Sequence, residues 1–182
     1  MVPYRIYLSG GGIAAAAHIG ALQELQKHTP ITAIREFMGV SAGAFVAMCL
    51  TIGYTLDELQ DFCLRFDFTN ITEMDSIPGW LVHFGMDTGD RLYKMIAACL
   101  HVKGLSSDIT FKDVYEQFGY SLRVLATDLH DAKPMVYAPD TTPAYCVVDA
   151  VRASMSVPYY FQPFVCPVTG HFLVDGLSLI HI

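Results

Sequence analysis

The chain has 182 residues, of which 53% are hydrophobic and 16% are charged. This length and composition predict one folded domain with a sizeable core and exclude an intrinsically disordered chain. The formal net charge of −7 excludes a nucleic-acid-binding protein that depends on a basic surface for phosphate contacts. The five cysteines are odd in number and lack the C-x-x-C spacing, so they predict neither a disulfide framework nor a zinc site.

The first third of the chain alternates predicted strands with predicted helices. We expect a strand over residues 4–8 and a helix over 14–27, then a second strand over 34–40 and a helix over 44–52. A glycine-containing turn joins each strand to its helix.

The rest of the chain continues this alternation with shorter elements. Thr55 and Glu58 have the spacing of a capping box, which predicts that a helix begins there. We expect further helices over 89–102, 110–118 and 144–155, and strands over 122–126, 135–138 and 172–174. Strands that alternate with helices predict an α/β fold in three α/β/α layers, with a mostly parallel central sheet.

Two uncharged runs, residues 37–56 and 153–174, are long enough to be tested as membrane spans. Glycines and polar residues in the first run, and three prolines in the second, oppose a helix that faces lipid. The N-terminal residues lack the basic start and apolar stretch of a signal peptide. The sequence therefore predicts no transmembrane segment, and a cytoplasmic or peripheral membrane location.

A serine flanked by glycines follows the second predicted strand. Gly39, Ser41 and Gly43 form a G-x-S-x-G pattern between that strand and a predicted helix. In this context the pattern is typical of a nucleophile elbow, where the glycines allow close backbone approach and the helix N-terminus favours negative charge. A plain small-residue turn is the alternative interpretation.

Gly10, Gly11 and Gly12 follow the first predicted strand and have several interpretations. With Ala15 they match the G-x-G-x-x-G/A pattern of a dinucleotide-binding loop, but the second strand does not end in the acidic residue that this loop requires. Successive glycine N–H groups can also form an oxyanion hole. We favour the oxyanion hole because the serine elbow follows the next strand, and a packing turn remains the third interpretation.

A nucleophilic serine requires a base. The histidines do not lie in loops that follow strands, where a triad histidine is expected, and His171 comes before the last strand. Asp175 ends that strand and is followed by glycine. A carboxylate in a dry site can serve as the base because burial raises its pKa. An ordinary Asp-Gly turn is the alternative.

Together these motifs resemble the patatin-like phospholipase family. Its members carry a glycine-rich oxyanion loop, a G-x-S-x-G elbow about thirty residues later and a late Asp-Gly motif, in the order and spacing seen here. Three further segments also match: Ala17-His-Ile-Gly20, Ala126-Thr-Asp-Leu129 and Ala153-Ser-Met-Ser-Val-Pro158. The resemblance covers essentially the whole chain.

The resemblance implies a Ser–Asp dyad that hydrolyses lipid acyl esters, as a phospholipase A or lysophospholipase does. Ser41 would form the acyl-enzyme, Asp175 would act as the base, and Gly10, Gly11 and Gly12 would hold the oxyanion. It implies a phospholipid or other acyl-ester substrate, peripheral membrane contact and no metal or cofactor. The aromatic stretch 66–84 is expected to form the acyl-chain wall or a membrane-facing cap, or part of the core.

Two departures from the family pattern bear on activity. Where the family has Lys or Arg and then Gly, this chain has Ala14 and Ala15, which predicts reduced activity. A catalytically weak lipid-binding protein is therefore the alternative function, ahead of a Ser-His-Asp hydrolase. Residues 177–182 are also the translation of a common transposon-end sequencing adapter, so we expect 1–182 to be one patatin-like domain that is incomplete at its C-terminus and non-native over 177–182.

Overall fold

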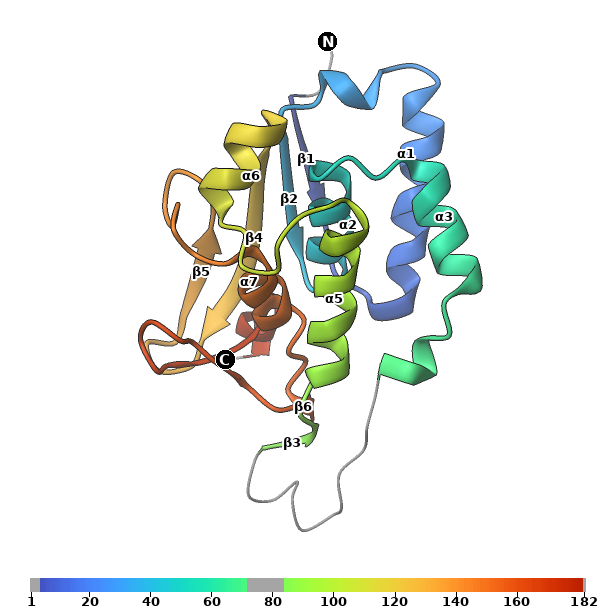
Figure 1. Cartoon of the computed structure of the whole chain (residues 1–182). Helices are drawn as coiled ribbons and strands as arrows, with labels where there is room; N and C mark the ends of the chain where they lie inside the picture. The colour runs from blue at the N-terminus through green and yellow to red at the C-terminus, as the bar shows by residue number, and fades with distance from the viewer. Residues whose placement is uncertain (1–3, 72–83, 182) are drawn as a thin grey trace.

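A mixed β-sheet of six strands forms the centre of the molecule (Figure 1). The computed structural model describes residues 4–71 and 84–181. The spatial order is β1-β2-β4-β8-β7, and β5 also pairs with β4. The strands are β1 (Arg5–Leu8), β2 (Glu36–Val40), β4 (Ser121–Asp128), β5 (Lys133–Tyr137), β7 (Phe164–Val165) and β8 (Phe172–Asp175).

The predicted α/β class, with a central sheet flanked by helices, is confirmed, but the sheet is partly rather than mostly parallel. β1, β2 and β4 are parallel, as the alternation of strands and helices predicts. β5 and β8 both run antiparallel to β4, and β7 runs antiparallel to β8. A short connection such as the one between β4 and β5 can only form a hairpin, which makes these strands antiparallel.

Helices cover one face of this sheet, and a second set packs outside them. α2 lies against β2 and β4, and every residue from Gly43 to Thr51 is buried, as an all-apolar helix requires. α6 and α7 also contact β4, α5 packs on α7, and α1 packs on α3. The bounds are α1 (Ala16–Gln26), α2 (Ala42–Thr51), α3 (Leu56–Arg65), α5 (Asp90–Val102), α6 (Phe111–Phe118) and α7 (Val147–Ser154).

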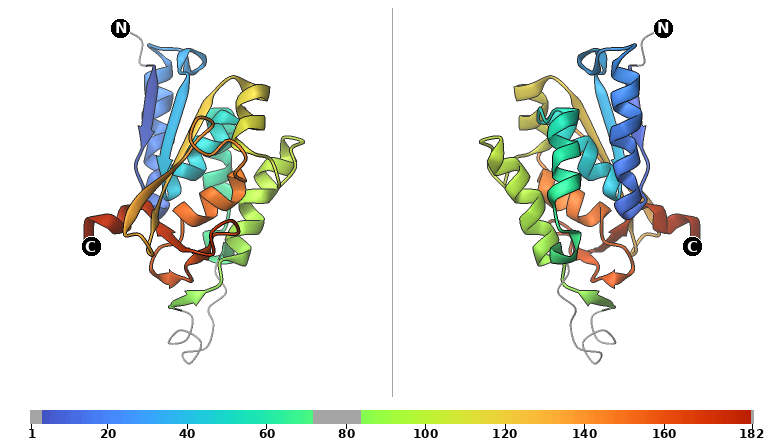
Figure 2. Two further views of the ribbon diagram at one scale, coloured as in Figure 1. Left: turned by 90° about the vertical axis from the view of Figure 1, so that its left-hand side faces the viewer. Right: turned by 90° about the vertical axis from the view of Figure 1, so that its right-hand side faces the viewer.

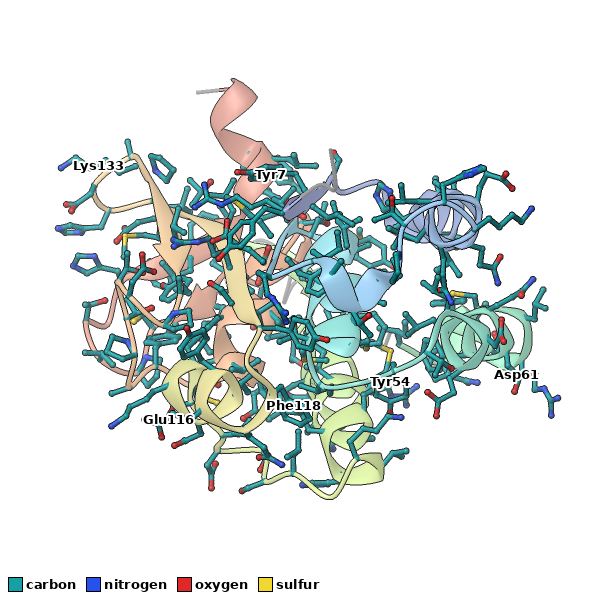
Figure 3. The ribbon with its side chains drawn as sticks, turned by 90° about the horizontal axis from the view of Figure 1, so that it is seen from above. Tyr7, Tyr54, Asp61, Glu116, Phe118 and Lys133 are labelled. Atoms are coloured by element: carbon teal, nitrogen blue, oxygen red, sulfur yellow. The ribbon has the colours of Figure 1, made fainter. Side chains whose placement is uncertain are left out.

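The opposite face of the sheet is partly exposed. In Figure 2, α2, α5 and α6 lie on one side of the strands. Seen from above in Figure 3, the exposed Tyr7 lies on the other side. On this face the buried Glu36 carboxylate forms ion pairs with Arg5 and Arg123. The Nε atoms of these arginines lie 3.1 and 2.9 Å from the Glu36 oxygens. The 3-10 helix η4 (Gly176–His181) contacts β4 and β5.

Three short strands have no recognisable pattern in the sequence. β3 (Gly85–Asp87) and β6 (Tyr159–Phe161) form a separate two-stranded parallel sheet, and β7 has two residues. A strand of two or three residues is too short for an alternating pattern, so only the tertiary structure reveals these strands.

The predicted helices occur, with small changes at their ends. Thr55 and Glu58 form the expected capping box at the start of α3. The first helix is preceded by a 3-10 turn, η1 (Gly12–Ala15), and two further 3-10 turns are η2 (Ile31–Ala33) and η3 (Phe68–Ile71). In the part of the chain that the structure describes, no helix has both the length and the apolar composition needed to cross a bilayer.

Candidate active site

Ser41 lies in a sharp turn between β2 and α2. Its backbone has φ 56° and ψ −133°, a conformation that non-glycine residues rarely adopt. A Cβ at Gly39 would lie 2.3 Å from the Gly43 carbonyl oxygen, and a Cβ at Gly43 would lie 2.2 Å from that of Leu8. Both positions therefore require glycine, because the backbones of β1, β2 and α2 touch there. The G-x-S-x-G motif forms the strained strand-to-helix turn that was predicted.

Asp175 lies on the same edge of β4 as β2, just beyond the end of β2. It is the last residue of β8 and pairs with Ala126, next to Leu125, which pairs with Val40 of β2. β8 runs antiparallel to β4, so it enters from the carboxyl edge of the parallel strands and brings Asp175 back toward the elbow. The sequence argument placed Asp175 at the carboxyl edge of a parallel sheet, but this antiparallel approach is what brings it to Ser41.

The Asp175 carboxylate is almost completely removed from water, with 3% of the residue exposed. Burial raises its pKa above the usual range, and hydrogen bonds with the Ser41 side chain and the Leu177 N–H partly offset this rise. The Leu177 N–H lies 2.9 Å from Oδ1. A carboxylate with a raised pKa in contact with a serine hydroxyl has the chemistry of a base and a nucleophile.

The glycine-rich turn lies directly against Ser41. A Cβ at Gly10 would lie 2.7 Å from Ser41 Cβ and 3.4 Å from its Oγ, so no larger residue fits there. Gly11 and Gly12 have φ of 152° and 55°, which favour glycine, and they lead into η1. The turn therefore lies beside the Ser41 hydroxyl at Gly10, which is where an oxyanion hole is required.

The two alanines that depart from the family pattern have different environments. Ala14 is exposed in η1, so a basic side chain there could have extended into solvent beside the turn. Ala15 has φ −61° and ψ −15°, an ordinary helical conformation that needs no glycine. The structure therefore accommodates Ala15 without strain, and the absent cation at Ala14 is the remaining chemical difference.

An apolar cavity of about 380 Å³ opens beside the elbow. Gly12 of the glycine-rich turn and Ala42, the residue after Ser41, both line it. The rest of the lining is almost entirely aliphatic or aromatic, and includes Phe45, Phe62 and Leu92. A cavity with so few polar groups suits a hydrocarbon chain rather than a sugar or a nucleotide.

The aromatic stretch 66–84 contributes partly to this cavity. Phe68 and Ile71, both in η3, line it, which supports the expected acyl-chain wall at that end of the stretch. The expectation also included Trp80, but residues 72–83 lie outside the described residues.

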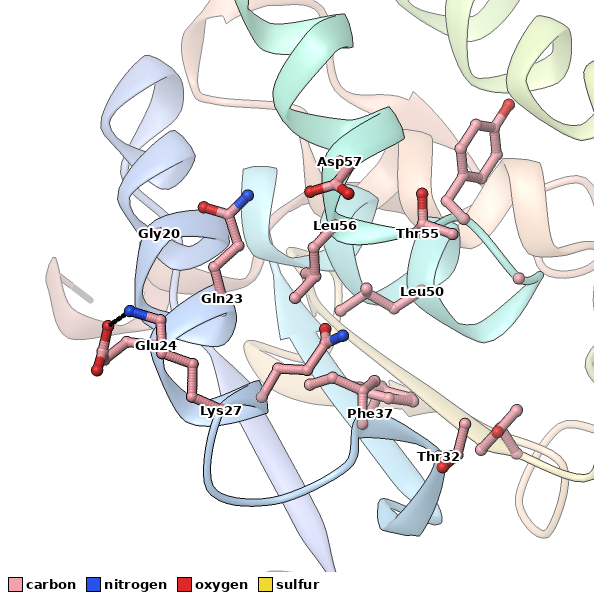
Figure 4. Close-up of a pocket in the computed structure, with 15 residues that line it drawn as sticks. Gly20, Gln23, Glu24, Lys27, Thr32, Phe37, Leu50, Thr55, Leu56 and Asp57 are labelled. Carbon is pink, nitrogen blue, oxygen red and sulfur yellow. Dashed lines mark hydrogen bonds and ion pairs between the residues drawn. The ribbon is translucent and has the colours of Figure 1, made fainter.

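A larger cavity of about 880 Å³ lies at the opposite end of α2 from Ser41 (Figure 4). Leu50 and Gly53 line it from the end of α2, and Glu24 and Lys27 line it from α1, where they form a 2.6 Å ion pair. Ser41, Asp175 and the glycine-rich turn do not line this larger cavity, so we do not take it as the candidate active site.

Two histidines that were considered as bases have other partners. His18 Nε2 lies 2.8 Å from the Ser9 carbonyl oxygen. His171 Nδ1 lies 2.8 Å from Asp128 Oδ2. These contacts agree with the preference for Asp175 over a histidine.

The sequence analysis did not identify the end of α7 and the segment that follows it, which support both candidate catalytic residues. The Ser41 N–H donates to Ser154 Oγ, and the Asp175 N–H donates to the Ser156 carbonyl oxygen, each at 2.9 Å. Both serines lie in the Ala153–Pro158 segment that matches the family pattern, but that match assigned them no role.

Comparisons with known proteins identify the family of this chain. A family model described as "Patatin-like phospholipase" matches residues 6–177. The chain is 27% identical over 173 residues to the "Probable lipid hydrolase 463L" of Invertebrate iridescent virus 6, covering 94% of this chain and 58% of that protein. It is 30% identical over 164 residues to "Triacylglycerol lipase ptl3" of Schizosaccharomyces pombe, covering 86% of this chain and 33% of that protein.

The fold is similar to those of two larger bacterial proteins. VipD from Legionella pneumophila superposes with a TM-score of 0.78 at 17% identity, covering 97% of this chain and 46% of VipD. ExoU from Pseudomonas aeruginosa, solved in complex with SpcU, superposes with a TM-score of 0.62 at 18% identity, covering 86% of this chain and 39% of ExoU.

A third relative, the "Uncharacterized protein YqhO" of Bacillus subtilis (strain 168), is 30% identical over 171 residues, covering 85% of this chain and 56% of YqhO. The chain thus spans little more than half the length of YqhO and of the viral relative. The family model nevertheless covers the glycine-rich turn, the serine elbow and the Asp-Gly motif together. The chain belongs to the patatin-like phospholipase family.

Proposed function

We propose that the protein is a lipid acyl hydrolase of the phospholipase A or lysophospholipase type, with Ser41 as nucleophile and Asp175 as base. The observation that carries this proposal is the position of the buried Asp175, which pairs with Ala126 of β4, while the adjacent Leu125 pairs with Val40, the residue before Ser41. The Ser41 side chain interacts with this carboxylate and partly offsets the rise in its pKa. The apolar cavity beside the elbow and the family membership both support it.

In the first half of the reaction, Ser41 Oγ attacks the carbonyl carbon of an acyl ester while its proton moves to Asp175. The raised pKa of Asp175 makes it a stronger base than an exposed carboxylate. The carbonyl oxygen becomes an oxyanion, which the N–H groups of the Gly10–Gly12 turn stabilise. Collapse of this intermediate breaks the ester bond, and the leaving alcohol takes the proton from Asp175.

In the second half, water hydrolyses the acyl-enzyme. Asp175 takes a proton from the water, whose oxygen attacks the acyl carbonyl carbon and forms a second oxyanion in the same turn. Collapse then breaks the bond to Ser41 Oγ, which recovers its proton from Asp175. The products are a free fatty acid and the starting enzyme.

The acyl chain of the substrate would occupy the apolar cavity. Gly12 and Ala42 lie on its lining next to the reacting groups, so a carbonyl bound at Ser41 can extend its chain toward Phe45 and Phe62. Burial of the chain would be driven by the hydrophobic effect, which depends on apolar area rather than on directional contacts.

Exposed apolar side chains at and near this cavity support peripheral contact with a membrane. Ile13, Val157 and Tyr160 line the cavity and are 72%, 43% and 39% exposed. Tyr159, adjacent in β6, is 73% exposed, and Phe84 beside β3 is 71% exposed. We propose that this surface enters the lipid interface and lets a substrate chain reach the cavity without crossing water.

Fatty-acid release from mixed phospholipid and lysophospholipid vesicles tests the proposal. The wild-type chain is compared with Ser41→Ala, and a fluorophosphonate probe reports whether Ser41 is nucleophilic. We expect release and labelling in the wild type and neither in Ser41→Ala. Vesicle binding without release or labelling would contradict the proposed reaction and favour the catalytically weak lipid-binding protein.

A further inference from the structure

The end of α7 and the segment directly after it are bonded to the backbone of both proposed catalytic residues. Ser154 Oγ accepts the N–H of Ser41, and the Ser156 carbonyl oxygen accepts the N–H of Asp175, each at 2.9 Å. Ser154 and Ser156 are both fully buried. One short segment at the end of α7 therefore contacts two residues that lie far apart in the sequence.

The Ser154 hydroxyl has a defined orientation. It donates its one hydrogen to the Leu125 carbonyl oxygen at 2.6 Å, which leaves its lone pairs to accept the Ser41 N–H. Leu125 precedes Ala126, the residue of β4 that pairs with Asp175. The hydroxyl thus links the serine elbow to the strand beside Asp175.

Ser41 needs this support because its backbone is strained. A serine with φ 56° and ψ −133° holds that conformation only where its surroundings determine it. The Ser41 carbonyl oxygen accepts the Ala44 N–H at 2.9 Å, and the Ser41 N–H donates to Ser154. Without the Ser154 acceptor, a buried N–H would lose its partner and the turn could relax.

Arg152 anchors the end of α7. It is 3% exposed, and its guanidinium donates to the Ser156 hydroxyl and to the carbonyl oxygens of Thr88 and Gly89. These bonds attach the end of α7 to the start of α5. Ser154 is therefore presented to Ser41 from a fixed position.

We propose that Ser154 is a positioning residue that holds the Ser41 backbone so that its Oγ faces Asp175. This inference rests on the proposed function, and Ser154 itself does not touch the substrate. Loss of its hydroxyl should lower kcat and leave KM nearly unchanged, because the acyl cavity is lined by other residues.

The kinetic test compares Ser154→Ala with Thr51→Val. Thr51 is also fully buried and lies on α2, but its hydroxyl donates to the Ala47 carbonyl oxygen, at the other end of the helix from Ser41. We expect Ser154→Ala to lower kcat by on the order of 10- to 100-fold with KM within about threefold. We expect Thr51→Val to keep kcat within about twofold, since it removes a buried hydroxyl that does not contact the site.

A third variant, Ser154→Cys, has a similar size and keeps a weak donor and acceptor. It is expected to give an intermediate kcat, and it provides the comparison if Ser154→Ala does not fold. A kcat in folded Ser154 variants equal to that of Thr51→Val would overturn the proposal.

A measurement without substrate separates this inference from the proposed function. Hydrogen exchange of the Ser41 amide, followed by NMR, should be at least about tenfold faster in Ser154→Ala than in the wild type, beyond any change at the core amide of Leu122. If the wild type releases no fatty acid, the proposed function fails. The exchange experiment then tests the positioning role of Ser154 without any kinetic data. Unchanged Ser41 exchange would then refute the positioning role, and accelerated exchange would support it.

Discussion

The two halves of the proposed dyad are built in different ways. Ser41 lies in one continuous segment, where β2, the G-x-S-x-G turn and α2 follow each other along the chain. Asp175 is placed by pairing of β8 with β4 and by a backbone bond to α7, elements separated from it in the sequence. The turn that holds the nucleophile is thus formed locally and is then supported by Ser154 from α7, whereas the position of the base depends entirely on the assembled core.

The first prediction concerns Asp175, the residue placed by the assembled core. Asp175→Asn keeps the shape of the side chain but removes the base, so we expect kcat to fall by on the order of 10⁴-fold. Fatty-acid release and the rate of fluorophosphonate labelling measure this loss, with the thermal midpoint as the control for folding. A loss of less than about tenfold would show that another group takes the serine proton.

The pH profile of the wild type tests the same residue. Asp175 acts as a base only when it is deprotonated, so kcat/KM should fall as the pH decreases through its pKa. Burial raises that pKa above the usual range of an aspartate, so activity should be lost at a higher pH than an exposed aspartate would give. A profile that stays flat down to about pH 4 would contradict the raised pKa of this base.

The stability of the elbow around Ser41 should be sensitive to substitutions of its glycines, because the backbone segments approach closely there. Gly43→Ala would place a Cβ 2.2 Å from the Leu8 carbonyl oxygen, and we expect it to lower the free energy of unfolding by about 3 kcal/mol. Gly20→Ala in α1 is the control, because a Cβ there meets nothing within 4 Å. We expect this control to stabilise the protein by about 0.5–1 kcal/mol. Urea unfolding measures the free energy of unfolding of both variants. Equal changes in the two variants would contradict the expected sensitivity of the elbow to an added Cβ.

The cavity offers a change of intermediate size. Cys63→Phe enlarges a side chain that lines it, and we expect the preference for short over long acyl chains to rise by about tenfold. Leu64→Phe is the matched control, since Leu64 is 78% exposed and does not line the cavity. Initial rates on ester series of increasing chain length measure the preference. An equal change in chain-length preference in Cys63→Phe and Leu64→Phe would show that the acyl chain does not occupy this cavity.

The smallest expected effect lies at the start of β8. The hydrogen bond to Asp128 raises the pKa of His171 above its usual value. Protonated His171 therefore contributes stability that is fully present below about pH 6.5 and is lost as the pH rises through the raised pKa. We expect the thermal midpoint to decrease slightly between pH 6 and 8.5, and Asp128→Asn to abolish that part of the decrease. An unchanged pH dependence in Asp128→Asn would show that this pair does not stabilise β8.

Features that depend on neighbouring residues could be predicted from the sequence. The elbow could be predicted because Gly39, Ser41 and Gly43 lie together between a strand and a helix, and a Cβ at Gly39 would meet the Gly43 carbonyl oxygen within the same turn. The requirement for glycine at position 43 is tertiary, because a Cβ there would meet the Leu8 carbonyl oxygen of β1. The capping box of α3 could be predicted because it satisfies the first N–H groups of a helix from within one turn. The choice of Asp175 as the base followed from its place at the end of a strand and from the family resemblance, and its contact with Ser41 agrees with that choice.

Features that depend on distant segments were decided only by the tertiary structure. The direction of β8, the pairing of β3 with β6 and the shape of the apolar cavity have no pattern in any short stretch of residues. Ser154 reads as an ordinary helical serine, and its role becomes visible only when α7 packs against the elbow. The amino-acid sequence by itself determined the local backbone turns, because sterics act between neighbours, while packing decided which side chains meet across the core.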